Sequence, residues 1–131
     1  MEIITAKSAG FCFGVNRAIE ACYKEIEKGG EIVTYGPLIH NKNVNADLAS
    51  KGVVSVDSLE GCEGKTVIIR SHGVGKAVYD ELESRGINYV DGTCPFVKKI
   101  HSIAHENYEK GIGVIIIGDA KHPEVMGING W

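Results

Sequence analysis

The sequence predicts an α/β fold in which a mainly parallel sheet is flanked by helices. Short apolar segments typical of buried strands alternate along the chain with segments in which apolar residues recur at helical spacing. Glycines and polar residues separate these segments, and no low-complexity linker interrupts them. Such alternation is typical of parallel strands in one sheet with helices on both faces.

The first predicted unit is a strand followed by a helix. Residues 2–5 are a short predicted strand. From Val15 to Ile26 the apolar residues recur at helical spacing, and the pair Gly29-Gly30 ends the helix. Cys22 lies on the apolar stripe of this helix, and we therefore interpret it as a core residue.

The next unit runs from a buried strand to a weaker one. Residues 32–35 are the buried strand and residues 53–56 the weaker strand. Between them, Asn41 can cap a helix that ends at Gly52. A polar, Gly-containing loop then carries Cys62, which we interpret as an incidental thiol because no convergent ionisable residues surround it.

The second half of the chain repeats this pattern. Residues 66–69 are a more strongly predicted strand than any that precedes them in the chain. A predicted helix containing Val78 and Leu82 follows them. Residues 87–90 are the next strand, after which Pro95 suits the first position of another helix. Residues 114–118 are fully apolar and predict a last strand, followed by a polar loop.

Composition and charge limit the classes of function. The 131 residues amount to about one domain, with 44% hydrophobic and 24% charged residues. The net charge of -3 offers no general basic field for nucleic acid or a membrane surface. Because no signal peptide or transmembrane run is evident, we expect a cytoplasmic protein with no membrane or nucleic-acid partner. Its four cysteines are then expected to be thiols or metal ligands rather than disulfides.

Chemically active residues follow the predicted strands. Because ligands of open α/β sheets bind at the carboxyl ends of the strands, these residues are expected on one rim. They are Cys12, His40, His72, Cys94 and His122. Cys12 lies between Gly10 and Gly14, and both Cys12 and Cys94 precede a predicted helix whose first amides favour the thiolate. The two cysteines could bind zinc, mononuclear iron or an iron-sulfur cluster, and the residue types leave these alternatives open.

The histidines suggest an anion site. If His40, His72 and His122 converge, they could donate hydrogen bonds to a phosphate or diphosphate, with Glu124 as a candidate proton donor. His101 and His105 form an i, i+4 pair on a predicted helix. We interpret this pair as surface or boundary residues, because the Glu of an H-E-x-x-H zinc motif is absent.

Several stretches, in order along the whole chain, match a known family. They read Gly-Phe-Cys-Phe-Gly-Val at 10–15 with Arg17-Ala18, Gly-Pro-Leu-Ile-His-Asn at 36–41, Arg-Ser-His-Gly at 70–73, Asp-Gly-Thr-Cys-Pro-Phe-Val at 91–97 and His-Pro-Glu-Val at 122–125. With these motifs the sequence resembles the 4-hydroxy-3-methylbut-2-enyl diphosphate reductases, the LytB/IspH family. The resemblance implies three similar α/β domains in a pseudo-symmetric, trefoil-like arrangement around a central cleft.

The resemblance also implies a set of roles. Cys12 and Cys94 would be two of the three cysteine ligands of a 4Fe-4S cluster. His40, His72 and His122 would hold the diphosphate, and Glu124 would supply a proton. Two electrons from a ferredoxin- or flavodoxin-like donor would remove the allylic hydroxyl as water, giving isopentenyl and dimethylallyl diphosphate in non-mevalonate isoprenoid biosynthesis.

The chain is shorter than members of that family. Residues 1–95 would be the first domain, and residues 96–131 would be the opening helix, strand and loop of an incomplete second domain. The third cluster cysteine would lie beyond residue 131, so we expect this chain alone to be inactive and prone to self-association through an exposed strand edge. Two alternatives stay open at this point: a non-catalytic module that binds phosphate or zinc, and a structural domain with idle cysteines.

Overall fold

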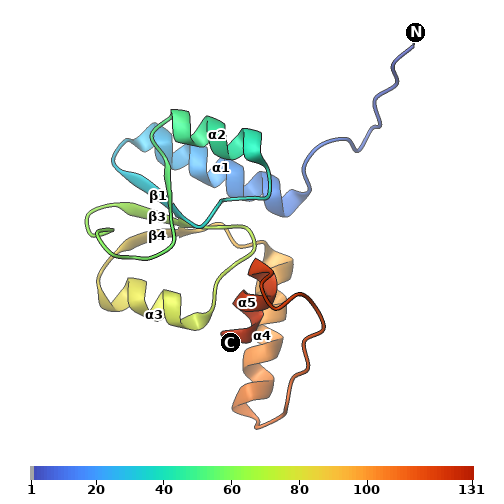
Figure 1. Ribbon diagram of the computed structural model, residues 1–131, viewed down its shortest axis with the longest axis vertical. Helices are drawn as coiled ribbons and strands as arrows, with labels where there is room; N and C mark the ends of the chain where they lie inside the picture. The colour runs from blue at the N-terminus through green and yellow to red at the C-terminus, as the bar shows by residue number, and fades with distance from the viewer. Residues whose placement is uncertain (1) are drawn as a thin grey trace.

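A four-stranded parallel sheet forms the centre of the computed structural model, which describes residues 2–131 (Figure 1). Its strands are β1 (Ile32–Tyr35), β2 (Val54–Val56), β3 (Thr66–Ile69) and β4 (Asn88–Asp91). They are ordered β2-β1-β3-β4, and every neighbouring pair is parallel. The predicted α/β fold with a parallel sheet is confirmed, and β1 and β3 coincide with the predicted strands.

Helices cover both faces of the sheet. They are α1 (Phe13–Lys28), α2 (Lys42–Ser50), α3 (Lys76–Ser84), α4 (Pro95–Glu109) and α5 (Pro123–Asn129). In Figure 1, α1 and α2 lie on one side of the sheet and α3 lies on the other, while α4 and α5 pack together beside it. Within residues 2–131, no helix has the length and apolar character needed to cross a membrane.

Two apolar clusters sandwich the sheet, one under each helical layer. Ile68 of β3 packs into the cluster that contains Ala18 and Leu48 of α1 and α2. Its neighbour Ile69 packs into the cluster that contains Leu82 of α3. Successive strand residues point to opposite faces, so both must be apolar when helices cover both faces.

The two remaining cysteines are core residues. Cys22 lies in the α1 and α2 cluster, as predicted from its position on the helical stripe. Cys62 is also buried, in the α3 cluster beside Leu59, although its loop is mostly polar in sequence. The apolar Leu59 and the thiol turn inward while the polar residues of this loop stay outside, so the interpretation of Cys62 as an incidental loop thiol missed its packing role.

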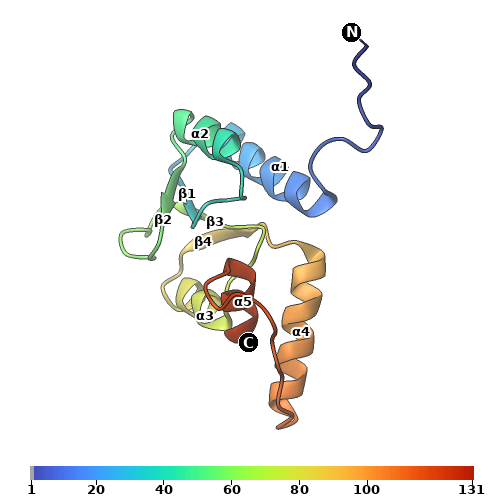
Figure 2. The same cartoon turned by 45° about the vertical axis from the view of Figure 1, so that its right-hand side comes forward.

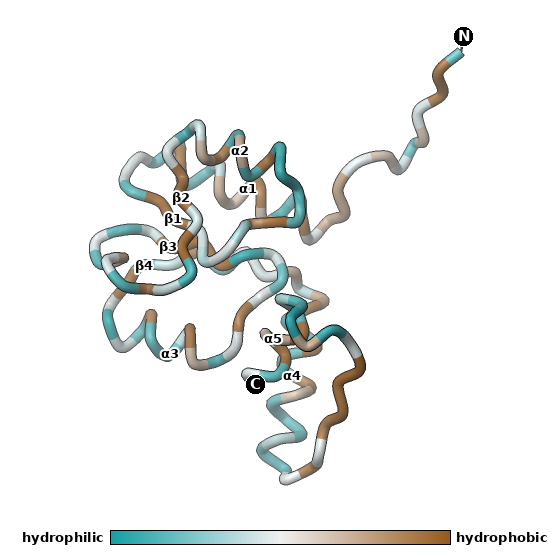
Figure 3. The backbone as a smooth tube through the Cα atoms, in the orientation of Figure 1, coloured by the Kyte–Doolittle hydropathy of each residue, from teal (hydrophilic) through white to brown (hydrophobic). Residues whose placement is uncertain are grey.

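Two predicted strands and one predicted loop were wrong. Residues 2–5 and 114–118 form no strand, because neither segment finds a partner strand among residues 2–131 with which to share backbone hydrogen bonds. Residues 112–117 instead run as the irregular apolar segment seen in brown between α4 and α5 in Figure 3, with Ile115 89% and Ile117 96% exposed. The residues after His122, predicted as a loop, form α5.

Candidate functional site

Three histidines gather at the carboxyl ends of β1 and β3. The loop after β1 carries His40 and the loop after β3 carries His72, and their ring centroids lie 4.2 Å apart. His122, which caps the N-terminus of α5, lies 5.7 Å from His40 and 6.1 Å from His72. From β1 the chain crosses to β2 on one side, and from β3 to β4 on the other, so this point is the switch in strand order where such folds bind ligands.

Short-range contacts fix the two histidine loops to each other. The Ser71 N–H donates to the Leu38 carbonyl at 3.1 Å, which ties the loop after β3 to the loop after β1. The Asn41 side chain accepts from the amides of Asn43 and Val44 and so caps α2 directly after His40. His40 and His72 therefore lie on loops with little freedom to separate.

A glycine and an arginine add a second tie between these loops. Gly36 follows β1 with φ +70°, and a Cβ added there would clash with the guanidinium of Arg70. The Nε of Arg70 donates to the Gly73 carbonyl at 3.4 Å, and burial lowers the pKa of Arg70. Gly36 and Arg70 each begin one of the motifs noted in the sequence, at 36–41 and 70–73, but sequence reasoning gave neither a role.

The electrostatics of the cluster keep His72 neutral. Burial, and then the nearby His40, Arg70 and His122, lower the pKa of His72 to about 4. Its buried Nδ1 has no hydrogen-bond partner within residues 2–131. A buried nitrogen of this kind is a candidate for a contact with a ligand, because an unpaired polar atom costs free energy.

The tautomer of His122 follows from its capping role. Its Nδ1 accepts a hydrogen bond from the Glu124 backbone N–H at 3.3 Å. In the neutral ring the proton is therefore on Nε2, which is left as a donor. Glu124 itself is half-buried in the first turn of α5, immediately beside this histidine.

Cys12 and Cys94 occupy equivalent positions at helix N-termini. Cys12 is the exposed N-cap residue of α1, and Cys94 is the half-buried N-cap residue of α4, with Pro95 in the first turn as predicted. A Cβ added at Gly14 would overlap with the Sγ of Cys94, so the first turn of α1 packs directly on this sulfur. The two helix starts, each with unpaired amides near a thiol, thus meet.

Arg17 holds the loop that carries Cys94. Its guanidinium donates to the carbonyl of Thr93 at 3.0 Å and to that of Asp91 at 3.4 Å. The Cys94 N–H in turn donates to the Ser71 carbonyl at 2.9 Å, so the cysteine loop is joined to the His72 loop. Sequence reasoning assigned Arg17 no role, although its place in the same motif as Cys12 was a usable signal.

The two sulfur atoms of Cys12 and Cys94 suit a soft metal that takes its other ligands from outside the described residues. Among residues 2–131, no group of three His, Cys, Asp or Glu side chains converges in a way that could hold a metal ion. Cys22 cannot complete a site, because burial and then Glu25 raise its pKa to about 11 and it lies in the core. Cys12 and Cys94 offer two sulfur ligands at helix N-termini, which fits iron or zinc but leaves coordination positions to be filled.

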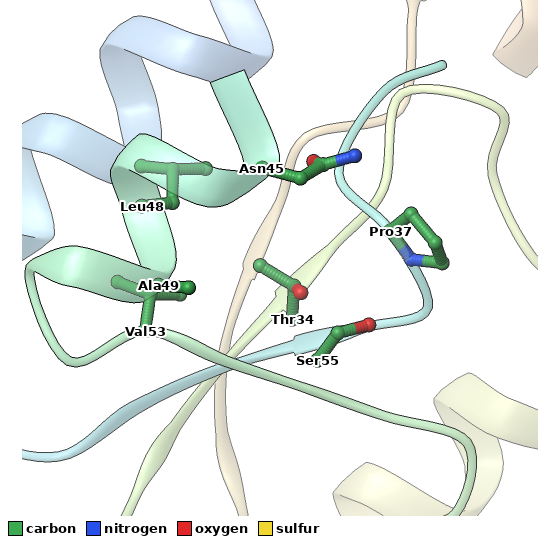
Figure 4. A pocket seen from close by; sticks show the side chains of 7 residues that line it. All are labelled: Thr34, Pro37, Asn45, Leu48, Ala49, Val53 and Ser55. Atoms are coloured by element: carbon green, nitrogen blue, oxygen red, sulfur yellow. The ribbon is translucent and has the colours of Figure 1, made fainter. Parts of the chain in front are cut away.

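A small cavity is a separate feature. It lies between α2 and the β1 and β2 strands, has a volume of about 140 Å³, and is drawn in Figure 4. Its lining residues are Thr34, Pro37, Asn45, Leu48, Ala49, Val53 and Ser55. None of these side chains is titratable and none is a candidate site residue, so the cavity offers no acid or base and no sulfur or imidazole ligand.

The histidine pair of α4 is placed differently from the prediction. His101 is only 3% exposed and stacks on Trp131, with ring centroids 5.4 Å apart and an interplanar angle of 23°. His105 meets the same indole edge-on at 5.9 Å. The predicted surface or boundary position is therefore wrong for His101, because α5 returns along α4 and covers this face of the helix.

The comparison with known families matches this arrangement. The sequence fits the family described as LytB protein over residues 3–131, nearly the entire chain. The chain belongs to the LytB family. The family that the sequence motifs indicated is thereby confirmed.

Relatives of known name share about half of the residues. The 4-hydroxy-3-methylbut-2-enyl diphosphate reductase of Thermoanaerobacter sp. (strain X514) is 53% identical over 136 residues, covering 100% of this chain and 47% of the relative. The reductase of the same name from Clostridioides difficile (strain 630) is 49% identical, covering 100% of this chain and 48% of the relative. The chain therefore spans about half the length of the curated relatives it matches.

Two solved structures share the fold. One is described as (E)-4-hydroxy-3-methyl-but-2-enyl diphosphate reductase, the terminal enzyme of the non-mevalonate pathway; it has a TM-score of 0.83 and 40% identity, covering 98% of this chain and 46% of that one. The other is the E-1-hydroxy-2-methyl-but-2-enyl-4-diphosphate reductase from Plasmodium falciparum, with a TM-score of 0.87 and 28% identity, covering 95% of this chain and 40% of that one.

Proposed function

We propose that this chain is the N-terminal part of a reductase acting on 4-hydroxy-3-methylbut-2-enyl diphosphate. The observation that carries the proposal is the cluster of His40, His72 and His122 at the switch point of the sheet, beside two cysteines at helix N-termini. The names of the relatives fit this chemistry. The reaction removes the allylic hydroxyl as water, consumes two electrons and two protons, and leaves isopentenyl or dimethylallyl diphosphate.

The histidines bind the diphosphate. His122 offers an Nε2–H donor, since its Nδ1 is occupied by the Glu124 amide. His72 is neutral before the ligand arrives, because burial lowers its pKa to about 4. A bound diphosphate favours protonation of the imidazole rings around it. The His72 Nδ1, which has no hydrogen-bond partner within residues 2–131, can then donate a hydrogen bond to the charged group.

Glu124 supplies a proton from a position next to the diphosphate site. Its backbone N–H is held by His122, so the carboxyl group starts from the same turn of α5 as the histidine. In this role the protonated carboxyl delivers its proton toward the reacting end of the substrate, while the histidines keep the diphosphate end in place.

Cys12 and Cys94 are two of the three cysteine ligands of a 4Fe-4S cluster. When bound, the cluster would pass on, one at a time, the electrons that the donor delivers and would supply Lewis-acid chemistry at the leaving hydroxyl. The chain would contribute two sulfur ligands at the N-termini of α1 and α4, and Gly14 in the first turn of α1 packs on the sulfur of Cys94. The third ligand comes from outside residues 2–131.

The surrounding organisation belongs to the same proposal. Residues 1–95 form the first of three similar α/β domains, and residues 96–131 start the second, with the apolar segment 112–117 available as a strand for its sheet. A ferredoxin- or flavodoxin-like protein delivers the electrons, and the protein works in the cytoplasm.

Cluster loading and turnover test the proposal together. The reductase, prepared at the full length of its relatives, is reconstituted anaerobically and assayed for iron, sulfide and conversion of the diphosphate. Cys12→Ala and Cys94→Ala are expected to abolish both loading and turnover, whereas Cys62→Ala, the same chemical change at a core cysteine, keeps them. Zinc without iron or sulfide in the unaltered protein would instead support a zinc-binding module.

A further inference from the structure

Helix α5 brings His122 into the histidine cluster, yet the chain before α5 does little to hold it. Residues 112–117 have no regular secondary structure, and all but one of them are exposed. Asp119 accepts hydrogen bonds from the amides of Lys121, through its carboxylate, and of His122, through its backbone carbonyl, and both contacts are local. The orientation of α5, and with it the position of His122, must therefore depend on how the helix docks on the rest of the fold.

The C-terminal end of α5 is clamped to the loop that follows His72. The indole Nε1 of Trp131 donates to the Val74 carbonyl at 2.9 Å, and the Lys76 N–H donates to the Gly130 carbonyl at 3.0 Å. A Cβ added at Gly130 would lie 2.6 Å from the Cα of Gly75, so the two backbones are in direct contact.

The Trp131 ring closes this clamp from the other side. It stacks on the buried His101 of α4 and meets Tyr79 of α3 at 5.8 Å. Figure 2 shows α5 lying between these two helices. His101 also fills the space beside two glycines, because a Cβ at Gly73 or Gly127 would meet its ring. Gly73 directly follows His72 in the chain, so the same ring contacts both the His72 loop and α5.

We infer that Trp131 is a positioning residue for the diphosphate site, which sets the place of His122 relative to His72 by clamping α5 onto the loop at 73–76. The seven residues of α5 span about 10 Å as a rigid rod. A clamp at one end of this rod therefore fixes the histidine at the other end. This inference rests on the proposed function for its effect on diphosphate, but not for its effect on geometry.

Two variants loosen the clamp in different ways. Trp131→Ala removes the stacked ring and its hydrogen bond, and Gly130→Ala keeps the ring but pushes Gly130 away from Gly75. Gly130 has φ −92°, so the added methyl strains no backbone angle there.

Gly113→Ala is the matched control for Gly130→Ala, because a methyl at Gly113 meets nothing within 4 Å. Tyr23→Ala is the control for loss of an aromatic ring with a hydrogen bond, to Asp47, outside α5.

Two measurements on the unaltered chain and its variants decide the inference. Proton NMR reports contacts between the rings of His72 and His122, with the His40 to His72 contact as an internal reference. Calorimetry with inorganic diphosphate reports affinity. Both clamp variants are expected to lose the His72 to His122 contact, to keep the His40 to His72 contact, and to bind diphosphate about tenfold or more weakly. Both controls should keep the contacts and the affinity of the unaltered chain.

The result that overturns the inference is a His72 to His122 contact that survives in both clamp variants. If the unaltered chain binds no diphosphate, the proposed role of the histidines fails, but the ring contacts still decide whether Trp131 sets their geometry. If Trp131→Ala does not fold, Gly130→Ala carries the same comparison.

Discussion

Gly14 lies against the sulfur of Cys94, so the helix that begins at Cys12 packs directly on the second cysteine. Only a residue without a side chain leaves room for this approach. The contact brings the first turn of α1, directly after Cys12, against a cysteine that is far away in the sequence, and it makes a glycine of α1 part of the environment of the N-cap residue of α4.

Gly14→Ala is expected to destabilise the chain and to impair cluster loading. The added methyl overlaps with the Cys94 side chain, and such overpacking costs roughly 1–3 kcal/mol. Chemical denaturation measures the stability, and iron content after reconstitution of the protein at the full length of its relatives measures the loading. The equivalent change at Gly113, where the methyl meets nothing, should leave both unchanged; equal iron content in the Gly14 and Gly113 variants would contradict the prediction.

Acid is expected to destabilise the chain through His72. Burial lowers the pKa of His72 in the folded state to about 4, whereas in the unfolded state the pKa is near 6.5. Between these pH values the unfolded state therefore binds a proton that the folded state does not bind. The free energy of unfolding should therefore fall as the pH decreases from about 6.5 to 4.

His72→Gln should flatten this dependence. Part of the slope remains, because burial also lowers the pKa of His101. Urea denaturation at a series of pH values measures the effect. An identical slope in the variant and the unaltered chain would show that His72 is not the group responsible.

Each histidine of the cluster is expected to contribute to diphosphate affinity. A hydrogen bond to a charged group contributes about 1.5–3 kcal/mol, so His40→Ala, His72→Ala and His122→Ala should each weaken binding of inorganic diphosphate roughly 10-fold to 150-fold. Calorimetry at constant salt measures it. Lys65 precedes β3, at the end of the strand opposite to the histidines, and pairs with Glu31. Lys65→Ala removes this charge and should change the diphosphate affinity little. A comparable loss for Lys65→Ala would point to general charge rather than to the site.

The exposed apolar segment at 112–117 is expected to cause self-association of this chain. Ile115 and Ile117 are almost fully exposed, and apolar segments without a strand partner tend to pair with other chains. Sedimentation across a concentration series should reveal oligomers, and the double variant Ile115→Lys/Ile117→Lys should remain monomeric. A monomer at every concentration in the unaltered chain would refute the expectation.

Local pattern predicted much of the fold and the choice of site residues. The apolar runs at β1 and β3 could be recognised because a strand covered on both faces needs apolar residues throughout. Cys12 and Cys94 could be placed at helix N-termini from the glycines and the proline beside them. His40 and His72 could be placed on one rim because parallel strands end at the same edge.

The tertiary structure decided what depends on a distant partner. Residues 114–118 have the composition of a strand, but a strand exists only where another strand accepts its backbone hydrogen bonds, and residues 2–131 offer none. His101 looked like a boundary residue on its helix, and it is buried because Trp131, Gly127 and the loop at Gly73 cover its ring. The sequence by itself therefore determined the parallel sheet and the residue types of the site. Packing between remote segments determined how α5 brings His122 to the other two histidines, because local sequence does not encode which surface a short helix will meet.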